Sequence, residues 1–195
     1  MLSIYPITPA VTQHLVISLT FWKPWIGLMG GSMTSKYLLS IDPGKATGVS
    51  YWRIPEDEPM ERFDFELVTD GIDGFIQYWN YYLPEAQTLV FEEYIDDGRA
   101  SHELDAIMIQ GLVRGTWDLR GFSDVHWNRN SKKGNVGDRL LKQHGLWLNG
   151  SDVGWTDGRD VNDSQLHALD WGKSYHRPTQ KFYWPKTYVE GEDDE

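Results

Sequence analysis

The sequence predicts a mixed α/β domain, because two kinds of apolar pattern alternate along it. From Lys36 onward, short apolar runs bounded by turn residues are typical of strands, and stretches with apolar residues at helical spacing lie between them. In chain order the segments are three strands, a helix, a strand, a helix, a strand and two helices. This order favours helices packed in layers against a sheet.

Five segments are predicted as strands. Residues 37–41 form a short apolar run, and the turn sequence DPGKATG separates them from the second strand at 49–54. Residues 61–68 alternate polar and apolar side chains, as a half-buried strand does. Residues 88–94 are almost continuously apolar, which is typical of a strand buried on both faces, and 124–127 is a shorter candidate.

Four helical segments complete the pattern. Residues 70–83 carry apolar side chains at helical spacing before a proline, and 101–119 have a serine N-cap and one apolar face. Residues 131–149 begin as a basic, glycine-containing loop and continue into a short helix, and 160–175 form the last helix.

We expect the domain to occupy residues 34–178, followed by an acidic tail at 179–195. Residues 1–33 are interpreted as a non-native or disordered extension, with Met33 as the natural initiator immediately before the first strand and Met29 as the alternative. The apolar stretch at 14–31 is interrupted by a lysine and a proline, is too short to span a bilayer and lacks the basic region of a secretory signal. An interfacial membrane anchor is a weaker alternative, because no basic polar face accompanies it.

The composition excludes several classes of protein. The chain has no cysteine, which excludes disulfides and thiolate zinc sites and suits a reducing cytoplasm. Its net charge of −11 argues against nonspecific coating of a duplex, although five of the last six residues are acids. The ten tryptophans and ten tyrosines mainly fill the core, but flat amphipathic rings can also stack on bases.

Acidic residues in two of the predicted strands are candidates for chemistry. Asp42 directly follows the first strand, and the turn at Pro43 and Gly44 clears space beside its carboxylate. Glu92 and Glu93 lie in an apolar strand, where a buried acid is costly unless it is paired or binds a cation. Strand alternation sends their side chains to opposite faces of the sheet, and we favour Glu92, with Glu93 as the alternative.

A third group of polar residues lies along the last helix. Asp160, Asp163, His167 and Asp170 are spaced so that they share one narrow stripe. A solvated polar face is the common explanation of such a stripe, but the two strand-borne acids elsewhere favour a functional one.

Separated acids on two strands and a helix suit a two-metal site. Mg²⁺ prefers oxygen ligands, and two such ions about 4 Å apart can activate a water and stabilise the leaving oxygen of a phosphodiester. The chain contains neither a G-x-S-x-G elbow nor a Walker A loop, which disfavours serine hydrolases and P-loop NTPases.

Three stretches of the chain resemble the catalytic motifs of the RuvC-like Holliday junction resolvases of bacteriophage type, in the RNase H-like superfamily. They occur in the family's order and read LLSIDPGKATGVSYW, LVFEEYI and RDVNDSQLHALDW. The resemblance implies an α/β, RNase H-like fold with a five-stranded mixed sheet flanked by helices. It also implies a homodimer without membrane association that cuts branched DNA with two Mg²⁺ ions, Mn²⁺ being possible, in the host cytoplasm if the protein is phage-encoded.

The resemblance also implies roles for individual residues. Asp42, Glu92 and Asp163 would bind metal, and His167 would assist as a further catalytic residue. His167 follows Asp163 by four positions, whereas cellular relatives commonly place the corresponding pair three apart. Asp160 and Asp170 therefore remain alternatives on the same helix.

The most basic stretch is predicted to contact DNA phosphates, each contact being independent of base sequence. An exposed lysine-rich loop would explain the same residues equally well. They are Arg129, Lys132, Lys133, Arg139 and Lys142.

Other functions remain open at this stage. The residues predict a metal site better than a four-way junction, so an RNase H-like nuclease acting on another DNA or RNA is an alternative. A catalytically inactive nucleic-acid-binding module of the same fold is a second alternative, although it would not need all three acids.

Overall fold

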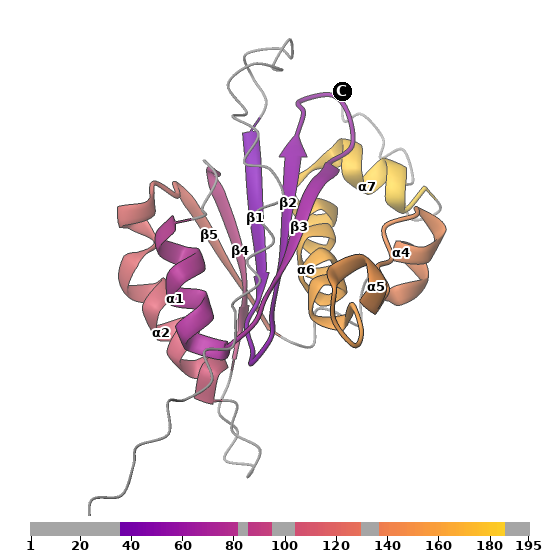
Figure 1. Cartoon of the computed structure of the whole chain (residues 1–195). Coiled ribbons are helices and arrows are strands. Elements are labelled where there is room, and N and C mark those ends of the chain that lie inside the picture. Colours follow the sequence, from indigo (N-terminus) through magenta and orange to yellow (C-terminus); the bar gives the residue numbers. More distant parts are fainter. Residues whose placement is uncertain (1–35, 82–85, 95–103, 130–136, 186–195) are drawn as a thin grey trace, which may run out of the picture. The chain divides into compact units, whose positions relative to one another are not determined.

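The structure is a computed structural model that describes residues 36–81, 86–94, 104–129 and 137–185. The predicted N-terminal extension lies outside these ranges. The described residues contain a five-stranded sheet with the order β3-β2-β1-β4-β5 (Figure 1). The strands are β1 (Lys36–Asp42), β2 (Thr47–Ile54), β3 (Glu61–Val68), β4 (Thr88–Glu93) and β5 (Asp124–Arg129).

The sheet is mixed, as predicted. β1, β2 and β3 pair antiparallel as consecutive strands, whereas β4 runs parallel to β1 and β5 runs parallel to β4. The carboxyl ends of β1, β4 and β5 therefore meet at one edge of the sheet. Asp42 is the last residue of β1 and Glu92 the penultimate residue of β4, so the topology brings both predicted acids to this edge.

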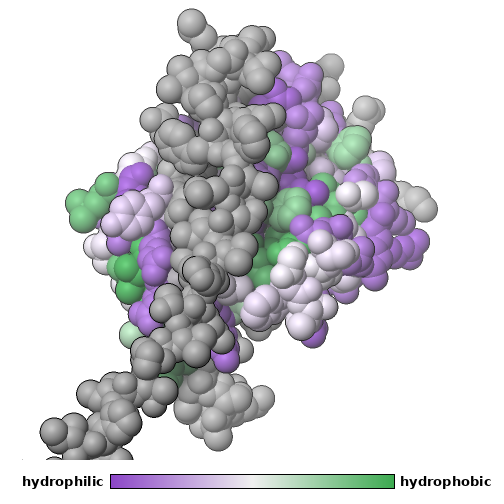
Figure 2. Space-filling model, in the orientation of Figure 1, coloured by the Kyte–Doolittle hydropathy of each residue, from purple (hydrophilic) through white to green (hydrophobic). Residues whose placement is uncertain are grey.

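Helices cover both faces of the sheet (Figure 1), which confirms the predicted flanked-sheet architecture. One face carries α1 (Gly71–Tyr81) and α2 (Leu104–Thr116), and the other carries α4 (Asp138–Gln143), α6 (Arg159–Tyr175) and α7 (Arg177–Tyr183). Figure 2, in the same orientation, shows hydrophilic side chains along the outer margin on the side of α4 and α7. Apolar side chains lie between that margin and the centre of the view. No helix in the described ranges has the length and apolar character needed to cross a bilayer.

Strand β1 is buried on both sides. Leu39 and Ile41 pack into the core beneath α1 and α2, whereas Leu38 points into the core beneath α6. This alternation continues in β4, where Phe91 joins the first core and Val90 the second. Glu92 follows Phe91, so its side chain points toward α6.

Helix α6 lies directly on the sheet rather than at its margin. The Ser40 hydroxyl in β1 donates a hydrogen bond of 2.7 Å to the carbonyl oxygen of Ser164. From β3, the Arg62 guanidinium donates one of 2.6 Å to the side-chain oxygen of Gln165. Both Ser164 and Gln165 are fully buried, so these polar residues of the helix are packed against protein and are not solvated.

A glycine in β2 permits this close approach. A Cβ atom on Gly48 would lie 1.9 Å from the carbonyl oxygen of Asp160 and 2.5 Å from the backbone nitrogen of Val161. No side chain can occupy that space without moving the first turn of α6. Gly48 is also the β-ladder partner of Asp42, so the helix start is held beside the end of β1.

Helical structure near the C-terminus extends further than expected. We predicted that the domain ends at residue 178, but α7 continues to Tyr183, and Thr179 and Tyr183 are buried. The Thr179 hydroxyl accepts a 2.7 Å hydrogen bond from the backbone nitrogen of Met60, and burial raises the pKa of the Tyr183 phenol to about 12. This short amphipathic helix was not predicted because the acids that follow it led to the whole segment being interpreted as a tail.

Replacing Gly48 with alanine tests the close approach of α6. The added methyl group must displace the first turn of the helix, so Gly48→Ala should lower the free energy of unfolding by about 1–3 kcal/mol or more. Urea denaturation measures the loss, with Gln77→Ala on exposed α1 as a control that should change stability by less than about 0.5 kcal/mol. Equal stability of Gly48→Ala and wild type would contradict the packing described here.

Candidate metal-binding site

Two carboxylates from adjacent parallel strands form the base of the site. Ile41 in β1 is in register with Phe91 in β4, so the next residues along, Asp42 and Glu92, are neighbours at the sheet edge. Both are buried, with 6% and 7% of their surface exposed. Two buried carboxylates side by side are more stable with a bound cation than without one.

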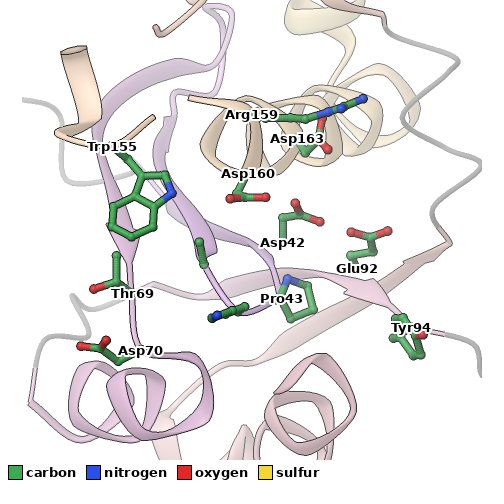
Figure 3. A pocket seen from close by; sticks show the side chains of 13 residues that line it. Asp42, Pro43, Thr69, Asp70, Glu92, Tyr94, Trp155, Arg159, Asp160 and Asp163 are labelled. Carbon is green, nitrogen blue, oxygen red and sulfur yellow. The ribbon is translucent and has the colours of Figure 1, made fainter. Parts of the chain in front are cut away.

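The choice between Glu92 and Glu93 follows from the strand's alternation. The Glu93 carboxylate accepts a 2.6 Å ion-paired hydrogen bond from Arg114, which lies on α2 on the opposite face of the sheet. Glu92 points to the α6 side, where Figure 3 shows its carboxylate facing that of Asp42. Only the first of the two glutamates therefore faces the site.

Helix α6 adds two aspartates from its first turns. Asp160 and Asp163 line the same cleft as Asp42 and Glu92, and Figure 3 shows the four carboxylates converging. Asp170, further along the predicted stripe, is buried but does not line the cleft among the described residues. The close packing at Gly48 explains why the first turn, and not only the middle of the helix, reaches the acids.

The acids lie in an open cleft of about 590 Å³ at this edge of the sheet. A volume of this order accommodates a small ligand or a segment of a polymer. Trp155 and Tyr94 also line it, from opposite ends in Figure 3. The charged residues lining it, among those described, are Asp42, Lys45, Asp70, Glu92, Arg159, Asp160 and Asp163.

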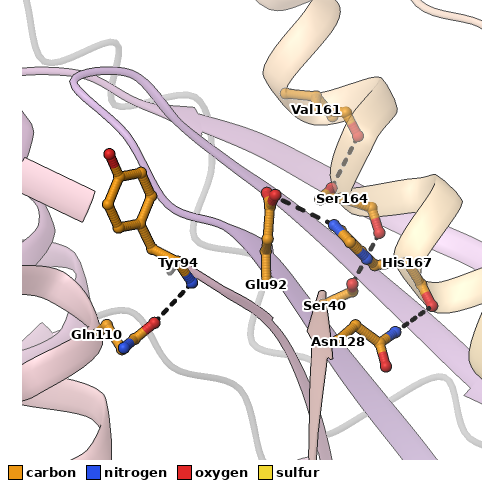
Figure 4. Close-up of polar contacts among 8 residues, drawn as sticks. All are labelled: Ser40, Glu92, Tyr94, Gln110, Asn128, Val161, Ser164 and His167. Carbon is orange, nitrogen blue, oxygen red and sulfur yellow. Dashed lines mark hydrogen bonds and ion pairs between the residues drawn. The ribbon is translucent and has the colours of Figure 1, made fainter. Parts of the chain in front are cut away.

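A histidine lies beneath the acids. His167 is fully buried, and its Nε2 is 3.6 Å from a carboxylate oxygen of Glu92 (Figure 4). Within the described residues, neither ring nitrogen has a hydrogen-bond partner. A buried imidazole that makes no hydrogen bond is destabilising by about 1–3 kcal/mol, which a coordinated cation would offset.

The donor atoms fit a divalent cation. Asp42, Glu92 and His167 each offer one ligand atom, and these three atoms lie within 4.8 Å of one another. Carboxylate oxygens suit Mg²⁺ and Mn²⁺, and an imidazole nitrogen suits transition ions. Asp160 and Asp163 could supply further oxygen ligands from the rim of the cleft.

The structure thus brings together the four residues expected to act in catalysis: Asp42, Glu92, Asp163 and His167. It adds Asp160, which had remained an alternative. Sequence reasoning missed Trp155 and Arg159, since a lone aromatic residue in a glycine-rich loop and a lone arginine have no spacing that marks them.

The predicted DNA-contacting residues are spread more widely. Arg129 is exposed at the end of β5, and Arg139 and Lys142 are exposed on α4. The Lys142 ammonium lies 4.2 Å from the centre of the Trp147 ring, a cation–π contact. Lys132 and Lys133 lie outside the described residues.

Comparison with known proteins gives likenesses to solved structures alone. No protein-family model and no curated protein matches the chain. The structure of T. thermophilus RuvC in complex with a Holliday junction substrate is 12% identical, with a TM-score of 0.46, and the match covers 71% of this chain and 96% of that one. A second Thermus thermophilus RuvC structure is 11% identical, with a TM-score of 0.45 and the same coverage.

The yeast mitochondrial Holliday junction resolvase Ydc2 is also similar, at 16% identity and a TM-score of 0.48, over 74% of this chain and 83% of that one. At such identities the ligand and the reaction have to be argued from this chain's own residues.

Divalent cations should stabilise the protein through these acids. At a concentration of about 100 times Kd, Mg²⁺ or Mn²⁺ should add about 2.7 kcal/mol to the free energy of unfolding. Asp42→Asn should lose most of this increment, whereas Glu93→Gln, whose side chain faces α2, should keep it. Denaturation with and without EDTA provides the measurement, and equal losses in both variants would place the ion elsewhere.

Replacing His167 tests whether this residue is a metal ligand or has only a structural role. His167→Leu removes two buried nitrogens that make no hydrogen bond within the described residues, so in EDTA the variant should be about 1–3 kcal/mol more stable than wild type. With Mn²⁺ present, its cation-induced stabilisation should be smaller than that of wild type. A loss of stability in EDTA would instead indicate that His167 forms a stabilising ion pair with Glu92.

Proposed function

We propose that the protein is a metal-dependent endonuclease that hydrolyses phosphodiester bonds in branched DNA, with the Holliday junction as its substrate. The observation that carries the proposal is the convergence of carboxylates from two parallel strands and one helix in an open cleft, above a buried histidine. Such a donor set suits hydrolysis at phosphorus, because hard divalent ions bind both the carboxylates and the phosphate oxygens.

The residues divide into two roles. Asp42, Glu92 and Asp163 would hold the ions, with Asp160 and His167 as additional ligands. The bound ions would supply an activated water and neutralise charge on the leaving oxygen. Arg159, which lines the cleft beside Asp163, would face a phosphate next to the one being cut.

Charge makes the cation essential for binding as well. The cleft is acidic and the chain has a net charge of −11, so a bare DNA backbone would be repelled from the site. Away from the cleft, Arg129, Arg139 and Lys142 would contact phosphates without reading sequence. DNA should therefore enter the cleft together with divalent ions.

We also propose a homodimer formed through α2. The outer face of this helix leaves Leu104, Ile107 and Met108 exposed, at 67%, 37% and 53%. A Cβ atom on Gly111 or Gly115 would meet no described residue within 4 Å, so the same face has room for a close partner. A second copy would bury these side chains and supply a second site for the opposing strand of a two-fold symmetric junction.

Cleavage of a labelled four-way junction, beside linear duplex, forked DNA and RNA, tests the proposed activity. Wild type should nick the junction in Mg²⁺ and should be inactive in EDTA. Glu92→Gln should lower the rate more than about 100-fold, since loss of even an outer-shell partner of a metal ligand costs 10–100-fold. Glu93→Gln, one residue away on the other face, should remain active.

The other outcomes identify the rival functions. Cleavage of forked DNA or RNA in place of the junction would support the metal site but refute the junction as the substrate. Junction binding without cleavage in any divalent ion would indicate an inactive binding module. Equal activity of Glu92→Gln and wild type would refute the site itself.

A charge placed on α2 tests the dimer. Met108→Asp should convert a dimer into a monomer, measured by light scattering during size-exclusion chromatography. Gln77→Asp, on the exposed surface of α1, is the matched control and should leave the mass unchanged. A wild-type protein that is monomeric at all concentrations would contradict the proposal.

A further inference from the structure

A second cavity adjoins the acidic cleft. Its volume is about 500 Å³, and Arg159 and Asp163 line both hollows. It extends from the first turn of α6 to Trp147 and to Asp138 at the start of α4. The two hollows therefore lead from the acids toward the helix that carries Lys142.

An exposed tryptophan, Trp155, lines the acidic cleft, and the residue that follows it, Thr156, lines the second cavity. Trp155 is 50% exposed, whereas Trp52 and Trp79 in the core are almost completely buried. Figure 3 shows its indole at one end of the cleft, with the carboxylate of Asp160 between it and Asp42. An aromatic face left open beside a polymer-sized cleft is suited to stacking.

The loop that carries Trp155 is closely built, so the ring is presented from a fixed turn. Its preceding helical turn, α5 (Gly150–Val153), has a capping box in which Asn149 and Asp152 bond reciprocally. Gly154 ends that turn at a φ of 71°, and the Trp155 backbone nitrogen donates a 3.0 Å hydrogen bond to the Gly150 carbonyl. A Cβ atom on Gly150 would lie 2.4 Å from the Trp155 carbonyl oxygen.

The chemistry of the path favours a base over a run of phosphates. Asp138, Asp157 and Asp163 line the second cavity, and Arg159 is the one cation among its described lining residues. At the far end, Trp147 lies under the Lys142 ammonium, an arrangement that suits a single backbone phosphate. Stacking, with one or two phosphate contacts, is what these residues can offer a nucleic acid.

We propose that Trp155 stacks an unpaired base next to the bond being cut, and that the second cavity receives the following nucleotide of the same strand. Arg159 faces the phosphate between the two. A base can lie flat on an indole only when it has left its own stack, so this site selects unpaired nucleotides such as those at a branch point. The position of this base relative to the cut rests on the proposed function. The binding of the strand does not.

Equilibrium binding to a fluorescent single-stranded oligonucleotide tests this site without requiring cleavage. Ca²⁺ is present, and a blunt duplex of the same sequence serves for comparison. Trp155→Ala should raise Kd for the single strand about 5- to 100-fold, the range expected for loss of one base stack, with duplex binding unchanged. Trp155→Phe should recover most of the affinity, and Tyr81→Ala, at a more exposed aromatic residue on α1, should match wild type.

The dependence of Kd on salt provides a further readout. Because stacking is not ionic, the ratio of the Trp155→Ala and wild-type Kd values should stay constant as salt rises, although both values increase. Equal Kd values for Trp155→Ala and wild type, or no recovery with phenylalanine, would overturn the inference.

The two proposals fail separately. Wild type that binds the oligonucleotide through Trp155 but cuts no substrate would refute the nuclease and leave this site standing. Junction cleavage with the same kcat/KM in Trp155→Ala and wild type would refute this site alone.

Discussion

The contact between Gly48 and the first turn of α6 is the constraint on which the site depends. Without a side chain at that position, the helix backbone reaches the sheet at the end of β1, and Asp160 and Asp163 reach the carboxylates of the strands. The Ser40–Ser164 hydrogen bond then fixes the helix along its axis. The site therefore depends on how closely the helix packs on the sheet, because that distance brings the acids of the helix to the acids of the strands.

The candidate metal site and the core also share one strand. β4 sends Val90 and Glu92 toward α6 and Phe91 toward α1 and α2, so the alternation that fills two apolar cores also selects which glutamate faces the cleft. Because the side-chain period is two residues, the burial of Phe91 fixes the position of Glu92. Stability and ligand geometry are thus set by the same register.

Much of this arrangement could be predicted from sequence because the information is local. The five strands follow from apolar runs and turns, and Asp42, Glu92 and the α6 stripe follow from their positions on those elements. Helix α7 could not be predicted, since its burial comes from partners such as Met60, more than a hundred positions earlier, and its periodicity is short. Trp155 was missed for a similar reason: its importance lies in the cavity it faces, which only the tertiary fold creates.

The two residues that follow Glu92 are both fastened to α2. Arg114 pairs with the Glu93 carboxylate and lies 4.4 Å from the centre of the Trp127 ring, and the Gln110 side chain accepts a 2.7 Å hydrogen bond from the backbone nitrogen of Tyr94. The outer surface of the same helix is the apolar face where a partner would sit. If two copies assemble through this face as proposed, a small rotation of α2 would pull on the backbone one peptide unit from the Glu92 carboxylate, and assembly would then affect the geometry of the candidate metal site.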